Sequence, residues 1–379
     1  MKKIVIISAF ETYQGRVDSV KKYFSEYSDV QIIKSDFEHF SKKRITKRNP
    51  DEILINTISY KKNISIRRLL SHYFFSRDIS KILKEQNPDM IYALVPPNSL
   101  IDFIAKYKKR HKGKQSKIFF DIIDLWPETM PISKLKDNFA FRYWSQIRNK
   151  NLYIADEVIT ECDYFQEKLP KEVEGTTIYL SRPYVDKDVI VPKSIDELNL
   201  CYLGSINNII DIDFIVKLSK EISKRRKVLI HIIGEGEKSE EFFDQLKTNN
   251  IEYKYYGKVY NEQKKQNIFN KCHFGLNVMK QSVFVGLTMK SIDYFEGGLP
   301  VINTIRGDSQ KFVEEEKCGL NFINRSDITN FTNEILSLSN KDIYEMKKNS
   351  RKLFIDNFTN EVFAEHMDKL LLNYLTKSE

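Results

Sequence analysis

Short apolar runs alternate with amphipathic stretches along most of the chain. The first run, Lys3–Phe10, is almost continuously apolar, as strands buried on both faces of a parallel sheet are. In the first half, the pattern predicts strands at 3–10, 30–33, 53–57, 90–95, 117–123 and 157–160. It predicts helices from the end of the first loop to about 27, at 66–85, from Pro96-Pro97 to about 107, and at 139–155. This alternation favours a parallel sheet covered by helices on both faces.

The same rhythm restarts in the second half of the chain. It predicts strands at 199–203, 228–233, 251–256, 274–278, 299–302 and 320–322, and helices at 213–224, 239–249, 263–271, 328–337, 341–357 and 359–375. The segment 179–194 between the two halves is rich in charges and contains Pro183 and Pro192, as a linker should. We therefore predict an α/β protein with Rossmann-like domains at 1–182 and 195–358, and a C-terminal helix at about 359–379 that packs back on the first.

Composition narrows the range of functions. The 379 residues are 41% apolar and 30% charged, which indicates a globular chain of about two domains. The net charge is +9, with basic runs at Lys42–Arg48, Lys106–Lys114 and Ser223–Lys227. These runs suit either solvated surface or an anionic membrane or substrate. No zinc finger, RRM signature or basic zipper is present, so nucleic acid is not an expected partner.

Metal, cofactor and membrane-spanning functions find no support in the sequence. The four cysteines form no CxxC pair, and the six histidines show neither HxH nor HExxH spacing. We predict no metal site and no cofactor. The Lys3–Phe10 run is too short for a signal peptide, and no apolar span of about 18 residues exists. The expectation is a cytoplasmic protein whose membrane contact, if it has one, is peripheral.

Glycines cluster after the predicted strands of the second domain, where open α/β sheets bind their ligands. The strand ends carry Gly204-Ser205, Gly234-Glu235-Gly236, Gly257-Lys258-Val259, Met279-Lys280 and the segment 286–293. Three consecutive glycine turns followed by a lysine-bearing helix start are typical of a nucleotide site. The Gly234-x-Gly236 pair lacks the third glycine of a dinucleotide fingerprint, so we do not predict NAD binding.

The segment VGLTMKSIDYFEGGLPVIN (285–303) carries the strongest chemical signal. Lys290 and Asp293 share one helix face. A helix N-terminus suits a phosphate, Lys290 would add positive charge there, and Asp293 could accept hydrogen bonds from sugar hydroxyls. The segment therefore suits a nucleoside diphosphate with its ribose. An ordinary surface helix ended by a glycine cap remains the alternative.

Three carboxylates lie in the sequence FDIIDLWPE (120–128), at one strand end of the first domain. Asp121 has the position of a buried structural carboxylate. Asp124, at the strand end, could take a proton from an acceptor hydroxyl or orient a sugar, and Glu128 could assist; turn capping is the alternative for both. Gly15 and Arg16 are expected on the first loop, where Arg16 either meets a phosphate or is solvated.

With these motifs the chain resembles the GT-B glycosyltransferases, two Rossmann-like domains facing a central cleft, and in particular the retaining family four and its capsule or exopolysaccharide members. The resemblance rests on FDIIDLWPE (120–128), YLGSI (202–206), IIGEGE (232–237), YYGKV (255–259) and VGLTMKSIDYFEGGLPVIN (285–303). It implies that Lys290 binds the diphosphate, that Asp293 binds the ribose, and that the turns at 204–206 and 257–259 contact diphosphate and base.

The implied site has two parts. The catalytic candidates are Asp124 and Lys290. The substrate-binding candidates are Gly15, Arg16, Glu128, Gly204, Ser205, Gly234, Gly236, Lys258, Val259, Met279, Gly286, Leu287, Thr288, Ser291 and Asp293.

The chain also departs from the family pattern. Val285 replaces the first of two glutamates and Asp293 the second, Ile123 stands where a histidine is usual, and Asn207 and Asn208 lie in the stretch that usually holds an Arg/Lys pair. The first loop has the single glycine Gly15 instead of a pair.

The resemblance implies a metal-independent transferase that moves a sugar from a nucleotide sugar, expected to be a UDP-sugar, to a lipid-linked or polysaccharide acceptor in surface glycan synthesis. A non-catalytic relative that binds nucleotide sugar or supports a partner transferase is the alternative, and an epimerase is a third. The helix at 66–85, with Arg67 and Arg68 beside Tyr73–Phe75, either rests on an anionic membrane or packs within the domain. A homo-oligomer remains open.

Overall fold

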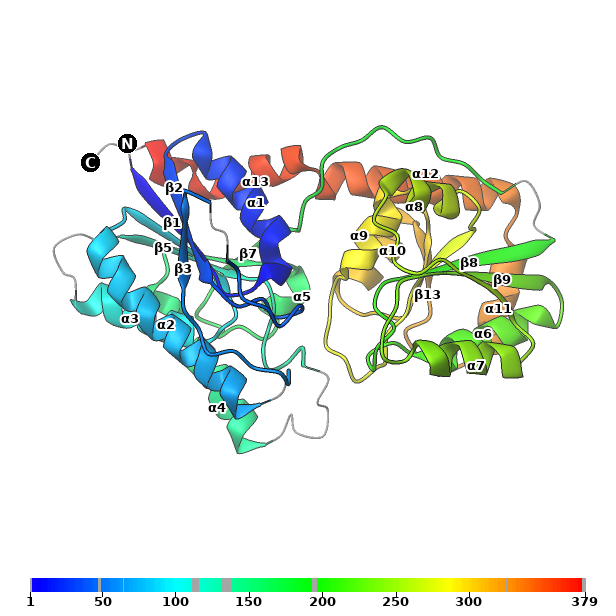
Figure 1. The fold of residues 1–379 in the computed structure, drawn as a ribbon. Coiled ribbons are helices and arrows are strands. Elements are labelled where there is room, and N and C mark those ends of the chain that lie inside the picture. Colours follow the sequence, from blue (N-terminus) through cyan, green and yellow to red (C-terminus); the bar gives the residue numbers. More distant parts are fainter. Residues whose placement is uncertain are drawn as a thin grey trace. The chain divides into compact units, whose positions relative to one another are not determined.

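The computed structural model describes residues 2–46, 49–63, 65–110, 116–130, 138–192, 196–324 and 326–376 (Figure 1). Parts of the basic runs at 42–48 and 106–114, and the ends of the predicted linker and C-terminal helix, lie outside these ranges. The chain divides into two compact units. Unit 1 comprises Met1–Arg182 with Asn360–Glu379, and unit 2 comprises Pro183–Thr359.

Unit 1 is built on a parallel sheet of seven strands in the order β3-β2-β1-β4-β5-β6-β7. Its strands are β1 (Lys3–Ser8), β2 (Asp29–Ser35), β3 (Glu52–Ile55), β4 (Met90–Val95), β5 (Lys117–Ile122), β6 (Glu157–Thr160) and β7 (Gly175–Thr177). Its helices are α1 (Gln14–Ser25), α2 (Ile66–Gln86), α3 (Ser99–Arg110), α4 (Phe139–Asn149), α5 (Asp163–Gln166) and α13 (Asn360–Thr376). The central strands are buried because their side chains are apolar on both faces.

Helix α13 completes the core of unit 1. Its residues Phe363, Met367 and Leu371 are buried in one cluster with apolar side chains of β1, β4 and α1. Tyr23 of α1 donates a hydrogen bond to Asp368 of α13 at 2.9 Å. The last helix of the chain therefore covers the first helix and the first sheet (Figure 1).

Unit 2 repeats this architecture with six parallel strands in the order β10-β9-β8-β11-β12-β13. Its strands are β8 (Glu197–Leu203), β9 (Lys227–Ile233), β10 (Glu252–Tyr255), β11 (Phe274–Asn277), β12 (Val301–Asn303) and β13 (Gly319–Asn321). Its helices are α6 (Ile212–Ser223), α7 (Ser239–Thr248), α8 (Glu262–Phe269), α9 (Met289–Glu296), α10 (Asp308–Glu316), α11 (Ile328–Ser337) and α12 (Asn340–Phe358).

Most predicted elements agree with the structure to within a few residues. The helix predicted at 139–155 is too long, because α4 ends at Asn149 and a 3-10 turn follows at Leu152–Ile154. The strand predicted at 299–302 begins only at Val301, because the Leu299 N–H bonds back to the Tyr294 carbonyl. Within the described ranges, no helix combines the length and the apolar character that crossing a membrane requires.

Candidate functional site

The strand order of unit 2 reverses between β8 and β11. From β8 the chain runs outward to β9 and β10, and it then returns to build β11, β12 and β13 on the other side. At such a point the loops after the two neighbouring strands separate and leave room for a ligand. The loop at Gly204-Ser205 follows β8, and the loop at Val278-Met279 follows β11.

The glycine turns beside this point pack backbone against backbone. A Cβ at Gly234 would lie 2.0 Å from the Gly204 carbonyl oxygen, and one at Gly236 would lie 2.2 Å from the Ile206 carbonyl oxygen. The Gly204 N–H donates to the Ile233 carbonyl at 2.9 Å. Gly204 and Gly234 also have φ of 122° and 126°, which side chains rarely allow. The close backbone contacts and the positive φ angles fix the shape of the turns after β8 and β9. Gly234 and Gly236 are therefore needed for the packing of these two turns against each other.

Helix α9 begins with a complete capping box. The Thr288 hydroxyl accepts from the Ser291 N–H at 3.2 Å, and the Thr288 N–H donates to the Ser291 hydroxyl at 3.3 Å. Thr288 also donates to the Asn277 side chain at the end of β11, at 2.8 Å. The Ser291 N–H at the start of α9 is therefore bonded within the protein and is not open to a ligand. Binding of an anion at this helix end would depend chiefly on the charge of Lys290.

Lys290 is buried with 8% of its surface exposed. Its Nζ lies 3.4 Å from the Val278 carbonyl oxygen and 4.9 Å from the centre of the Tyr202 ring, and its stem passes 4.0 Å from the place of a Cβ on Gly204. No carboxylate among the described residues forms an ion pair with it. Burial lowers the pKa of Lys290 to about 7. A buried ammonium without a counter-ion at the switch point is a ready partner for a phosphate.

Asp293 lies one turn further along α9 and pairs with Lys265 at 3.1 Å. Lys265 also reaches Glu262 at 2.9 Å. Both carboxylates contribute to raising the pKa of Lys265, although burial acts in the opposite direction. About a fifth of Asp293 is exposed, so the ion pair fixes the carboxylate at the surface of the helix.

The remaining candidates of unit 2 differ in exposure. Lys258 is exposed and forms an ion pair with Glu235, which joins the turns after β9 and β10. Gly286 is buried, and its carbonyl accepts from the Ser309 N–H at 2.8 Å. Ser205 is exposed, whereas Val259, Met279 and Leu287 are half-buried along the strand-end loops.

In unit 1, Asp124 follows the end of β5 and accepts hydrogen bonds from three side chains. It accepts from the Trp126 indole N–H at 2.6 Å, from the Thr129 hydroxyl, and from the Tyr13 hydroxyl at 3.4 Å. Burial raises the pKa of Asp124, while the hydrogen bonds from Thr129 and Trp126 act against that rise. The carboxylate is half-buried and held in one orientation, as a group that positions a hydroxyl must be.

The sequence prediction for Arg16, a loop position facing a phosphate or solvent, is wrong. Arg16 lies in α1 with Gly15 and not on a loop, and it is 1% exposed, so it neither is solvated nor reaches the surface. Its guanidinium forms two hydrogen bonds to Asp121, at 2.7 and 3.2 Å, and one to the Tyr179 carbonyl at 3.0 Å. Asp121 is the buried structural carboxylate that the sequence predicts.

Glu128 is committed to a structural partner as well. Its carboxylate forms a bidentate pair with the fully buried Arg148, at 2.8 and 2.9 Å. Arg148 also donates to the Trp126 carbonyl, so the pair stabilises the loop that carries Asp124. Gly15 is exposed at the start of α1.

Glu161 and Tyr13 are missing from the sequence prediction, although both lie close to Asp124. Glu161 follows β6 directly. Burial raises its pKa to about 8, Arg16 opposes the rise, and Asp124 adds to it. The rule applied to the other strand ends would have found Glu161, whereas nothing in the sequence pairs Tyr13 with Asp124. Among the described residues, no cluster of three or more His, Cys, Asp or Glu side chains could hold a metal ion.

Known proteins resemble this chain in part of its sequence and in its fold. Residues 197–341 match the family model "Glycosyl transferases group 1". Among solved structures, sucrose-phosphate synthase from Thermosynechococcus elongatus is similar over 100% of both chains, with 14% identity and a TM-score of 0.70. The lipopolysaccharide outer core galactosyltransferase WaaB matches over 98% of this chain and 99% of its own, with 15% identity and a TM-score of 0.68.

A structure of HepE from Anabaena in complex with UDP matches over 98% of this chain and 100% of its own, with 11% identity and a TM-score of 0.67. No curated protein matches the sequence. Two Rossmann-like parallel sheets and these structural relatives confirm the predicted GT-B fold class.

Proposed function

We propose that the protein is a glycosyltransferase that takes a sugar from a nucleotide sugar. One observation carries the proposal: Lys290 is buried without a carboxylate partner among the described residues, at the switch point of unit 2. Burying an unpaired ammonium is costly, and at Lys290 this charge lies at the switch point, where a ligand is expected. A diphosphate beside its Nζ would supply the missing counter-ion. Lys290 also lies within the segment that matches the glycosyltransferase model.

The chemistry at the donor follows from the state of this lysine. Without a ligand, burial lowers the pKa of Lys290 to about 7, so its neutral form is accessible near neutral pH. A diphosphate favours the charged form, since an opposite charge nearby raises the pKa of an amine. When the bond between the sugar and the diphosphate breaks, negative charge accumulates on the leaving group. A fixed ammonium stabilises that charge without further rearrangement.

The donor nucleotide and the reaction type are parts of the same proposal. HepE, similar in fold, is bound to UDP in one structure and to UDP-glucose in another. A UDP-sugar is accordingly the first donor to test. The resemblance to retaining family-four enzymes suggests retention of configuration and transfer without a metal.

The acceptor is assigned to unit 1, at Asp124. A carboxylate with a raised pKa and a fixed orientation suits a group that accepts a proton from, or aligns, an acceptor hydroxyl. We propose a lipid-linked or polysaccharide acceptor in surface glycan synthesis at the inner face of the cell membrane. A non-catalytic, donor-binding relative is the second candidate, because Ile123 stands in place of the usual histidine.

Calorimetry with UDP, GDP, TDP and CMP tests the donor site. We expect one nucleotide, UDP first, to bind wild type and to lose at least tenfold in affinity in Lys290→Met. Lys347→Met is the matched control, because Lys347 is a second buried lysine of unit 2, on α12, with its pKa lowered by burial to about 8. Equal loss in both variants, or no binding by wild type, would contradict the proposal. Binding without transfer to any acceptor would favour the non-catalytic relative.

A further inference from the structure

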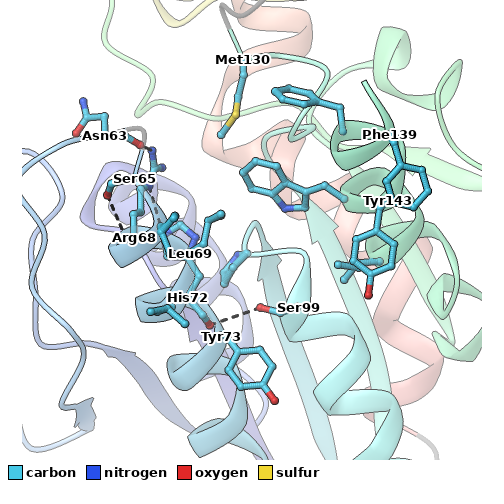
Figure 2. Close-up of a pocket in the computed structure, with 16 residues that line it drawn as sticks. Asn63, Ser65, Arg68, Leu69, His72, Tyr73, Ser99, Met130, Phe139 and Tyr143 are labelled. Carbon is cyan, nitrogen blue, oxygen red and sulfur yellow. Dashed lines mark hydrogen bonds between the residues drawn. The ribbon is translucent and has the colours of Figure 1, made fainter. Parts of the chain in front are cut away.

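An apolar groove opens between α2 and α4 in unit 1 (Figure 2). Its cavity has a volume of about 790 Å³. Leu69 and Tyr73 of α2 line one side, and Phe139 and Tyr143 of α4 line the other. Phe139 is 81% exposed and Tyr143 57%, although both are large and apolar. Exposed apolar surface of this kind marks a binding site.

One end of the groove is cationic. Arg68 is the one charged side chain among the described residues that line the groove, and it is 7% exposed. Its Nη1 donates to the Asn63 carbonyl at 2.6 Å, and its Nε lies 3.4 Å from His72 Nε2. Burial lowers the pKa of His72 well below its ordinary value, so the imidazole is neutral. No carboxylate among the described residues forms an ion pair with Arg68.

The cationic end adjoins the proposed acceptor carboxylate. The Arg68 guanidinium lies 4.4 Å from the centre of the Trp126 ring, and the Trp126 indole N–H donates to Asp124 at 2.6 Å. A single side chain therefore separates the charged end of the groove from Asp124. An amphiphile whose chain fills the groove would bring its polar head next to that carboxylate.

We propose that this groove binds the lipid phosphate of a lipid-linked acceptor, with the hydrocarbon chain between α2 and α4 and the phosphate at Arg68. The inference rests on the proposed function and names its acceptor class. Charge complementarity selects this occupant, since Arg68 forms no direct ion pair with a described carboxylate and planar guanidinium groups bind phosphates bidentately. A purely apolar partner, such as a protein helix, would leave the buried guanidinium uncompensated.

The two tryptophans of the chain make the groove directly observable. Trp144 lines the groove, and Trp126 lies under Arg68. Titration with geranyl, farnesyl and geranylgeranyl monophosphate below their aggregation limits is therefore expected to change the intrinsic fluorescence. Affinity should rise by about tenfold or more with each five-carbon unit, because each buried methylene adds to binding. Farnesol should bind at least tenfold more weakly than farnesyl phosphate, and inorganic phosphate should leave the fluorescence unchanged.

Variants decide whether the groove is responsible. Arg68→Met should remove the preference for farnesyl phosphate over farnesol, and Tyr143→Glu should weaken both at least tenfold. Tyr153→Glu is the matched control, since Tyr153 is a tyrosine of unit 1 that is 65% exposed and does not line the groove. Circular dichroism would verify folding of each variant. Equal affinity for farnesol and farnesyl phosphate, or equal effects of Tyr143→Glu and Tyr153→Glu, would overturn the proposal.

Two further experiments distinguish lipid-phosphate binding from membrane docking and from donor binding. If anionic vesicles change the fluorescence but monomeric farnesyl phosphate does not, the surface docks on membranes and the lipid-phosphate site is refuted. Lys290→Met should bind farnesyl phosphate like wild type. Lipid binding without nucleotide binding would refute the donor site and leave the groove, and nucleotide binding without lipid binding would do the reverse.

Discussion

Replacing Lys290 by methionine should make the free protein more stable while it weakens donor binding at least tenfold. The lysine is 8% exposed, and burial lowers its pKa from 10.5 to about 7. One pKa unit is worth about 1.4 kcal/mol, so the difference corresponds to about 5 kcal/mol against the charged form in the folded protein. Methionine has a similar length and no charge, and it fits irregular apolar space.

The gain depends on pH with a defined sign. Below pH 7, Lys290 is charged in both the folded and the unfolded protein, so its full destabilising effect of about 5 kcal/mol applies. Between pH 7 and 10.5 the unfolded chain holds a proton that the folded protein lacks, and the stability of wild type therefore rises with pH. The advantage of Lys290→Met should fall from about 4 kcal/mol at pH 7 to about 2 at pH 9 and about 1 at pH 10.

Urea denaturation of wild type and variant at pH 7, 8, 9 and 10, followed by far-ultraviolet circular dichroism, measures this difference. Trp126 and Trp144 both belong to unit 1, so tryptophan fluorescence follows that unit as an internal reference that should not change. Saturating UDP should stabilise wild type more than the variant. A variant that is less stable than wild type at pH 7, or a difference that does not depend on pH, would refute the reasoning.

Three further substitutions test other parts of the two units. Asp124→Asn keeps the shape of the side chain and should lower transfer at least about 100-fold in steady-state assays, with unchanged UDP affinity by calorimetry. Arg16→Met leaves the buried Asp121 without its cation and should cost about 3–5 kcal/mol in urea denaturation; a surface-like cost below about 1 kcal/mol would contradict the buried pair. Gly234→Ala places a Cβ 2.0 Å from the Gly204 carbonyl oxygen, so a loss of at least about 2 kcal/mol with weaker UDP binding is expected, and a neutral effect would exclude the close packing of these turns.

The sequence predicts the sheets well wherever strands are apolar on both faces. β4 has the predicted bounds, because a continuous apolar run between polar turns allows few other registers. β7 (Gly175–Thr177) was not predicted, since it is a short polar strand at the sheet edge whose only signal is its pairing with β6. α10 (Asp308–Glu316) was missed because only Phe312 and Val313 mark its apolar face, too few to show a helical period.

The position of residues after predicted strands also identifies the candidate loops, but it does not show which charged side chains are buried or paired. The strand-end rule finds Asp124 and the segment around Lys290, because parallel strands deliver their loops to one edge. It gives Arg16 the wrong environment, since the pairing with Asp121 joins residues 105 positions apart and no local pattern reports it. The burial of Lys290 is equally invisible in the sequence, where the same lysine could stand on a surface helix.

Arg16 and Lys290 are both buried cations, and they differ in their partners. Arg16 is enclosed with a carboxylate that accepts two hydrogen bonds from it, and Asp121 accepts a third from Tyr92 at 2.6 Å, so the buried charges compensate each other. Lys290 has a carbonyl at 3.4 Å and an aromatic ring, which only partly replace water around an ammonium. Residues that reduce the stability of the free protein are retained where a bound state needs them. Lys347 on α12 is also buried without an ion pair among the described residues, so burial alone does not identify a ligand site. The charge of Lys290 supports the donor site because it lies at the switch point beside Gly204, where a bound diphosphate would compensate it.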